Sequence, residues 1–195
     1  VAAAQAALDG DWGQLTAAER ARLLLRMSAR VLEQADELAR LEALDVGKPL
    51  RQGRADAVAL ARYLEFYGGA ADKLMGQTIP FANGYTAFTL REPHGVTGHI
   101  VPWNYPMQII GRSVGAALAM GNACVLKPAE EACLTALAFG RIAQRVAELT
   151  GLPRGVVEGV WPLSAIMPAP YADVCSGRNG DGAVSNDAAV DGGHR

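Results

Sequence analysis

Apolar and polar positions alternate with a helical period through the first third of the chain, which predicts amphipathic helices. Thr16 followed three residues later by Glu19 is the signature of a capping box, and Gly47 before a Lys-Pro pair is typical of a helix end. A further helix is predicted over 55–71. These helices show packing faces and no recognisable chemistry. The apolar positions of the first run are Leu23, Met27, Leu38, Leu41 and Leu44.

The period changes in the stretch QTIPFANGYTAFTLREP. Here Asn83-Gly84 stands between runs rich in β-branched and aromatic residues, and an Asn-Gly pair in such a setting is a strong signal for a hairpin turn. We therefore predict a β-hairpin over about 77–91.

From residue 95 onward, short apolar runs alternate with longer helical runs. Strands are predicted over 95–101, 123–127 and 155–160, with helices over 106–120 and 134–149 between them. The run ACVLK is continuously apolar up to its last residue, as in strands that are buried on both faces of a parallel sheet. This alternation predicts an α/β fold with a partial doubly wound parallel sheet and right-handed crossovers.

The changes of pattern divide the chain into four parts. Residues 1–73 are predicted to form an N-terminal helical part, 74–93 the hairpin and 94–160 the doubly wound unit. Residues 161–195 show no sustained period and are rich in Gly, Pro, Ala, Asp and Asn, so we expect a disordered tail.

Composition narrows the functional classes. Of the 195 residues, 50% are hydrophobic and 19% are charged, which is enough to build one sizeable core. The net charge of −2 gives no sign of a clustered basic face, so no nucleic-acid partner is predicted. The most apolar run, 113–126, is interrupted by Gly and Asn and is shorter than the ~20 residues of a membrane span, so no membrane association is predicted.

The beginning of the sequence and the pattern of its cysteines bear on where in the cell the protein is located. No signal peptide is visible, and the absence of an initiating Met fits a start partway into a longer protein. The three cysteines are odd in number and unevenly spaced, so we expect neither a disulfide framework nor a CxxC metal pair. A reducing, cytoplasmic setting is the simplest interpretation.

Several familiar motifs are absent from the sequence. No GxGxxG follows the first predicted strand, and GxxxxGK[ST], HExxH and GxSxG do not occur. The three histidines do not cluster, and no metal site is predicted.

Polar clusters do follow two of the predicted strands, at the place where doubly wound sheets bind ligands. Lys127 and Glu130 follow the second strand, where a Lys can contact phosphate or ribose oxygens and a Glu can accept from ribose hydroxyls. The alternative is a solvated loop with two charges. Asn104, after the first strand, either caps the next helix or donates its amide to a developing oxyanion. Spacing alone favours the solvated loop and the cap.

One long segment closely resembles the coenzyme-binding portion of the NAD(P)-dependent aldehyde dehydrogenase superfamily. It reads GVTGHIVPWNYPMQIIGRSVGAALAMGNACVLKPAEEACLTAL. Three features carry the resemblance in order: Pro-Trp-Asn-Tyr-Pro, then Ala-Leu-Ala-x-Gly-Asn, then Lys-Pro-Ala-Glu. Together with the N-terminal helices and the hairpin, the resemblance extends from about Val1 to about Val160. It implies a Rossmann-like sheet that binds its coenzyme without GxGxxG.

The resemblance also implies roles for individual residues. Asn104 matches the family's Asn, whose amide helps to stabilise the oxyanion formed when a Cys thiolate attacks the aldehyde. Lys127 and Glu130 match the pair that holds the adenosine ribose, and Glu130 favours NAD while leaving NADP possible, because a carboxylate would repel a 2′-phosphate. The residues that match the lining of the coenzyme cleft are Val101, Pro102 and Trp103.

The implied activity is oxidation of a small aldehyde to a carboxylate with NAD(P)+. The hairpin resembles the strand pair through which family members form homodimers or homotetramers.

The sequence departs from the family after about Val160. The family's nucleophilic Cys, its general-base Glu and its glycine loop are not found, and none of Cys124, Cys133 and Cys175 stands in a setting that favours a reactive thiolate. We therefore expect a truncated or frameshifted chain. Two alternatives to an enzyme follow: an inactive fragment that binds coenzyme weakly, and a partner that docks onto full-length homologues through the hairpin.

Overall fold

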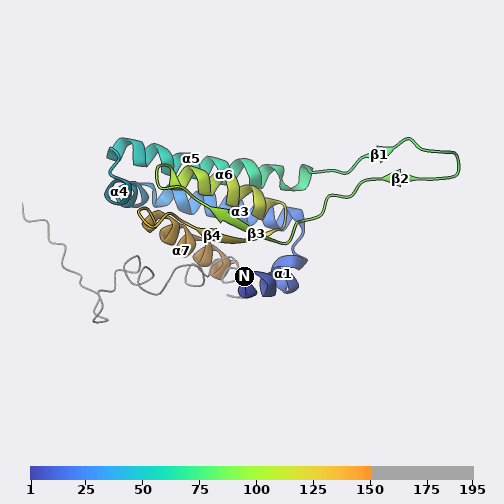
Figure 1. The fold of residues 1–195 in the computed structure, drawn as a ribbon, viewed down its shortest axis with the longest axis horizontal. Coiled ribbons are helices and arrows are strands. Elements are labelled where there is room, and N and C mark those ends of the chain that lie inside the picture. Colours follow the sequence, from blue (N-terminus) through green and yellow to red (C-terminus); the bar gives the residue numbers. More distant parts are fainter. Residues whose placement is uncertain (151–195) are drawn as a thin grey trace, which may run out of the picture.

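Five α-helices open the chain in the computed structural model, which describes residues 1–150 (Figure 1). A short 3-10 turn, Ala71–Lys73, follows the last of them. No helix within these residues is long and apolar enough to cross a membrane. The five helices are α1 (Ala2–Asp9), α2 (Asp11–Gln14), α3 (Ala17–Glu33), α4 (Ala35–Val46) and α5 (Leu50–Ala70).

The capping box predicted for the first long helix is confirmed. Thr16 Oγ1 accepts from the Glu19 amide at 3.3 Å, and the Glu19 carboxylate accepts from the Thr16 amide at 2.8 Å. The predicted single run is in fact two helices, because the chain leaves helical geometry at Gln34 (φ −106°, ψ 15°) and begins α4. Gly47 ends α4 at φ +76°, in the left-handed conformation that glycine adopts without steric cost. Leu44 is 79% exposed, so it does not belong to the core.

A parallel β-α-β unit follows, as predicted. Strand β3 (Val96–Ile100) leads into α6 (Pro106–Ala119), which returns the chain to β4 (Ala123–Lys127). The two strands pair in parallel, with Val96 opposite Ala123 and Ile100 opposite Lys127. Helix α7 (Leu134–Leu149) comes next. The predicted strand over 155–160 and the predicted tail lie outside the described residues.

Strand β4 is buried on both faces, as its continuous apolar run predicted. Cys124 and Leu126 point into the large core, while Ala123 and Val125 join a small second cluster with Ala4 of α1. Helix α1 therefore covers one face of the β3–β4 pair, and α6 packs on the pair from the side of the large core. A polar side chain in the middle of this strand would have no water on either side.

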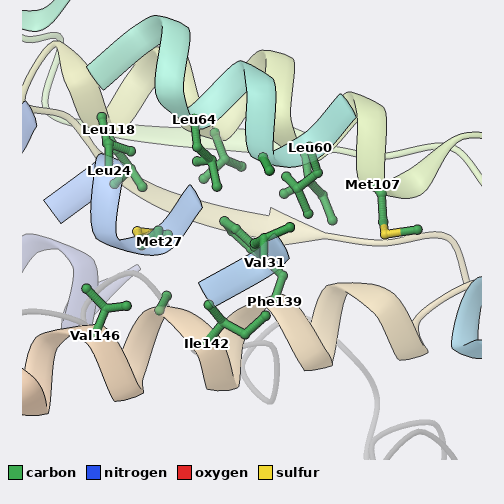
Figure 2. Close-up of a cluster of buried hydrophobic side chains, with 14 of the residues drawn as sticks. Leu24, Met27, Val31, Leu60, Leu64, Met107, Leu118, Phe139, Ile142 and Val146 are labelled. Carbon is green, nitrogen blue, oxygen red and sulfur yellow. The ribbon is translucent and has the colours of Figure 1, made fainter. Parts of the chain in front are cut away.

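The large core lies between four helices and one face of the sheet. Figure 2 shows side chains from α3, α5, α6 and α7 meeting there. Gly111 of α6 allows close packing against α5, since a Cβ at this position would lie 3.0 Å from Cβ of Tyr63. The face of α6 that carries Gly111 and Gly115 is thus the face that packs on α5. Fully buried members of the core include Leu24, Leu60, Leu64, Met107, Ile110, Phe139 and Ile142.

The predicted β-hairpin is present and projects away from the helices (Figure 1). Strands β1 (Thr78–Ile79) and β2 (Ala87–Phe88) pair antiparallel. At the tip, the Tyr85 amide donates to the Ala82 carbonyl at 3.2 Å, and Gly84 has φ +85°. The Asn-Gly signal therefore located the turn correctly.

Candidate functional site

The ends of β3 and β4 bring the two predicted polar segments to the same edge of the sheet. The Val101 amide donates to the Lys127 carbonyl at 2.9 Å, which extends the parallel ladder by one hydrogen bond. Because the two strands are parallel, the segments that follow them leave the sheet in the same direction. The segments 101–104 and 127–130 therefore begin side by side.

The first segment passes from the core to the surface within two residues. Val101 is buried, whereas Pro102, Trp103 and Asn104 are all exposed. The interpretation of Asn104 as a helix cap is wrong, because the N-cap of α6 is Tyr105 and no side-chain cap bond is present. The carboxamide of Asn104 makes no hydrogen bond to any residue within 1–150.

The second segment is a tight turn between β4 and α7. Lys127 is partly buried and Glu130 is exposed. Neither side chain forms an ion pair or hydrogen bond inside the described part of the chain, so both are available to a ligand. Asp45 of α4 holds the far end of this turn, since its Oδ2 accepts from the Leu134 amide at 2.7 Å. Burial raises the pKa of Asp45, and this hydrogen bond partly offsets the rise.

Asn122, which sequence reasoning did not single out, fixes the opposite end of the sheet. Its Oδ1 accepts from the Gly95 amide at 3.1 Å, and its Nδ2 donates to the Ala117 carbonyl at 3.1 Å. Its own carbonyl accepts from Trp12 Nε1 at 3.2 Å. Asn122 closes the motif Ala-Leu-Ala-x-Gly-Asn, so the signal was present in the sequence. One buried residue thus ties α2, α6 and the start of β3 together, through its side-chain amide and its main-chain carbonyl.

The cysteines within residues 1–150 are not candidate nucleophiles. Burial raises the pKa of Cys124 to about 12, so its thiol stays protonated near neutral pH. Cys133 is disulfide-bonded, which contradicts the expectation of unpaired cysteines at this position. Cys175 lies outside the described residues.

Three other features of residues 1–150 were candidates for a functional site: His99, clusters of metal-binding side chains, and surface hollows. None of them brings predicted site residues together. Burial lowers the pKa of His99, whose Nε2 lies 2.9 Å from Thr97 Oγ1. Residues 1–150 contain no group of three or more His, Cys, Asp and Glu side chains that could hold a metal ion. Two surface hollows of about 190 and 250 Å³ lie along α3, and no predicted site residue lines them.

The chemistry at the strand ends suits a polar organic ligand with an anionic group. An unpaired ammonium at Lys127 can bind phosphate or hydroxyl oxygens, and an unpaired carboxylate at Glu130 can accept from two hydroxyls. The exposed indole of Trp103 offers an apolar wall, and the Asn104 amide offers two donors. A nucleotide coenzyme presents these complementary groups.

Comparisons with known proteins agree on one family. The family model described as "Aldehyde dehydrogenase family" matches residues 1–166. A hydroxyisobutyraldehyde dehydrogenase of Mycolicibacterium austroafricanum is 46% identical over 157 residues, which cover 80% of this chain and 30% of the relative. A mitochondrial aldehyde dehydrogenase, family 2 member B4, of Arabidopsis thaliana is 43% identical over 174 residues. These residues cover 88% of this chain and 32% of the relative.

The solved structures give the same answer. A Burkholderia cenocepacia protein solved as an aldehyde dehydrogenase is 66% identical, with a TM-score of 0.73 over 80% of this chain and 32% of that protein. PnpE, solved in complex with nicotinamide adenine dinucleotide, is 41% identical, with a TM-score of 0.74. The match covers 80% of this chain and 31% of PnpE. The chain thus spans between 30% and 32% of the length of these four proteins.

Proposed function

The chain belongs to the aldehyde dehydrogenase family, and on that basis we propose that it carries part of a coenzyme site for oxidising an aldehyde to a carboxylate with NAD(P)+. The observation that supports this most is the pairing of Val101 with Lys127. It sets the exposed Pro-Trp-Asn segment and the Lys-Pro-Ala-Glu segment at the carboxyl ends of adjacent parallel strands, where sheets of this type bind ligands.

In this proposal, Lys127 and Glu130 hold the ribose and phosphate side of the coenzyme. Both side chains lack partners among residues 1–150, so ligand binding would cost no existing ion pair. A carboxylate at Glu130 accepts from ribose hydroxyls and repels a 2′-phosphate, which favours NAD over NADP. Among the similar structures are PnpE, solved with nicotinamide adenine dinucleotide, and an Escherichia coli NADP-dependent enzyme, so both coenzymes fit the family.

Val101, Pro102 and Trp103 would line the cleft, and Asn104 would donate its amide to the oxyanion that develops on the aldehyde oxygen. The coenzyme, when bound, supplies the hydride acceptor. Among residues 1–150 no thiol or carboxylate stands as a nucleophile or general base, so we propose that this part of the chain binds coenzyme without turning an aldehyde over by itself. A cytoplasmic location and the four-part division of the chain stay predictions.

A second function is supported by the hairpin. Its exposed apolar side chains suit a protein interface better than open water. We propose that this surface assembles copies of the chain into homodimers or homotetramers, or docks onto a longer homologue. The exposed apolar residues of the hairpin are Ile79, Phe81, Tyr85, Phe88 and Leu90.

Titration with NADH, followed by the change in its fluorescence, tests the coenzyme site. We expect saturable binding that weakens on the order of 10-fold in Lys127→Met and in Glu130→Gln, because each loses a charge-assisted hydrogen bond. Glu131→Gln is the matched control, since this neighbouring carboxylate is also exposed and has no assigned role. Absence of saturable binding, or equal effects of the Glu130 and Glu131 variants, would overturn the proposal.

Two further assays separate the alternatives. Aldehyde-dependent formation of NADH by the purified chain would contradict a binding-only role. Co-purification with a tagged full-length family member, lost on deletion of residues 77–91, would support the docking role.

A further inference from the structure

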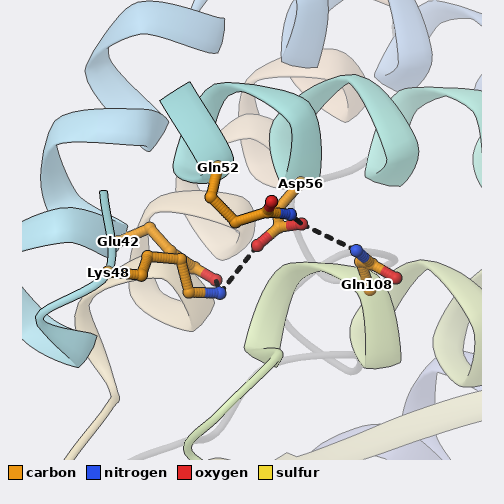
Figure 3. A network of polar contacts seen from close by, with 5 residues as sticks. All are labelled: Glu42, Lys48, Gln52, Asp56 and Gln108. Atoms are coloured by element: carbon orange, nitrogen blue, oxygen red, sulfur yellow. Dashed lines mark hydrogen bonds and ion pairs between the residues drawn. The ribbon is translucent and has the colours of Figure 1, made fainter. Parts of the chain in front are cut away.

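A buried ion-pair network lies beside the start of α6 (Figure 3). Lys48 Nζ lies 2.8 Å from Glu42 Oε1 and 2.6 Å from Asp56 Oδ2, and both carboxylates are fully buried. The other oxygen of Asp56 accepts from Gln52 Nε2 at 2.9 Å and from Gln108 Nε2 at 2.6 Å. The network therefore joins α4, the loop that follows it, α5 and the first turn of α6.

Lys48 makes a third contact that reaches the candidate site. Its Nζ lies 4.5 Å from the centroid of the Tyr105 ring, which is a cation–π distance. Tyr105 is the N-cap of α6 and directly follows Asn104. One ammonium is thus shared between two buried carboxylates and the aromatic ring next to the proposed amide donor.

Fold stability alone does not explain this arrangement. A buried ion pair gains little over well-packed apolar side chains, because the loss of hydration offsets most of the attraction between the charges. Here a single cation faces two buried carboxylates. The contacts do restrain the ammonium from three sides, which fixes its position against the Tyr105 ring.

The turn before α6 has few other specific restraints. No side-chain hydrogen bond caps the helix. The side chains of Trp103 and Asn104 are exposed and form no hydrogen bond to other residues in 1–150. Apart from the hydrogen bond that the Tyr105 carbonyl accepts from the Ile109 amide at 3.1 Å and the packing of α6 itself, the ring of Tyr105 is the side-chain contact that can hold this stretch in place.

Resting on the proposed role of Asn104, we propose that Lys48 is a positioning residue. Held by Glu42 and Asp56, it anchors the Tyr105 ring and through it the backbone that carries the Asn104 amide. Such restraint matters because a donor stabilises an oxyanion only when it is already aimed at the position where the charge develops.

Nitrogen-15 relaxation of the full chain tests this positioning through the backbone order parameter of Asn104. Tyr105→Leu removes the ring and leaves the ion pairs intact, while Tyr105→Phe keeps the ring and is the matched control. We expect the order parameter to fall from about 0.85, typical of rigid backbone, to below about 0.6 in Tyr105→Leu and to stay unchanged in Tyr105→Phe.

A second variant tests the contact between Lys48 and Tyr105 by removing the cation instead of the ring. Lys48→Met with Glu42→Gln removes the cation together with one carboxylate, while Asp56 keeps its bonds to Gln52 and Gln108. We expect the same loss of order at Asn104, with α3 as rigid as in the wild type. Unchanged order at Asn104 in both this variant and Tyr105→Leu would overturn the proposal, and so would an equal loss of order throughout α3.

These experiments can contradict the proposed coenzyme site and the proposed role of Lys48 independently of each other. Relaxation is measured without coenzyme, so its result does not depend on the coenzyme site. NADH titration of the same samples tests that site. Loss of order at Asn104 in the variants, together with a wild-type chain that binds no coenzyme, would contradict the proposed function while supporting the positioning role.

Discussion

Two buried polar side chains define the geometry at opposite ends of the β3–β4 sheet. The Asn122 side chain makes two hydrogen bonds to main-chain groups at the end where the strands begin, and the Asn122 main chain makes two more, one of them to the Trp12 indole. Glu42 lies in the network near the other end, where its Oε1 pairs with Lys48 Nζ and its carboxylate is fully buried. The first residue is fully satisfied and stabilises the fold, whereas the second carries an electrostatic cost.

The pKa of Glu42 predicts the direction of one pH effect. Burial raises this pKa above its ordinary value of 4.5, and Lys48 offsets the rise only in part. The folded chain therefore keeps the Glu42 proton to higher pH than the unfolded chain. The contribution of Glu42 to the free energy of unfolding is largest below about pH 4.5 and is lost as the pH rises through the folded-state pKa.

Glu42→Gln removes this titration. Urea unfolding of both proteins at mildly acidic and at neutral pH should show the variant gaining stability relative to the wild type as the pH rises. Asp45, whose pKa is also raised by burial, titrates in both proteins, so its effect cancels in the comparison. A wild type that gains on the variant with rising pH would contradict the assigned burial.

At the scale of elements, the helices and the hairpin serve different purposes. Helices α5 and α6 pack closely at Gly111, so the middle of α6 is held against α5. The hairpin has only two paired residues on each strand and projects away from the helices (Figure 1). A two-stranded ribbon of this kind is marginal alone in water, which favours its use as a contact between chains.

Light scattering coupled to size-exclusion chromatography tests the hairpin interface. We expect the wild-type chain to elute as a dimer or larger, and Phe88→Asp to elute with a smaller mass, because a buried charge would disrupt the interface. Phe66→Asp is the control, since Phe66 is similarly exposed (68% against 61% for Phe88) but lies on α5. A monomeric wild type, or equal effects of the two substitutions, would contradict the prediction.

For the whole molecule, local patterns in the sequence predicted most of the elements. The capping box at Thr16, the turn at Gly84 and the doubly buried β4 each depend on neighbouring residues, and the structure confirms all three. The two polar segments were located because motifs mark both strand ends. Their roles in coenzyme binding stay proposals.

Contacts between distant parts of the chain were not predictable in this way. Trp12 and Asn122 are 110 positions apart, and nothing in either local sequence indicates that they bond. The meeting of Lys48 with Tyr105 likewise depends on how α4, α5 and α6 pack. The break at Gln34 was missed because the helical period of apolar residues continues across it.

The central claim is that the ends of β3 and β4 form the coenzyme site, and amide hydrogen exchange of the full chain tests it most directly. Exchange is compared with and without saturating NAD+, peptide by peptide. We predict slower exchange in 101–105 and 127–131 on addition of NAD+, with no change in the hairpin or along the outer face of α3. Unchanged exchange in both segments, or protection confined to the hollows along α3, would contradict the account.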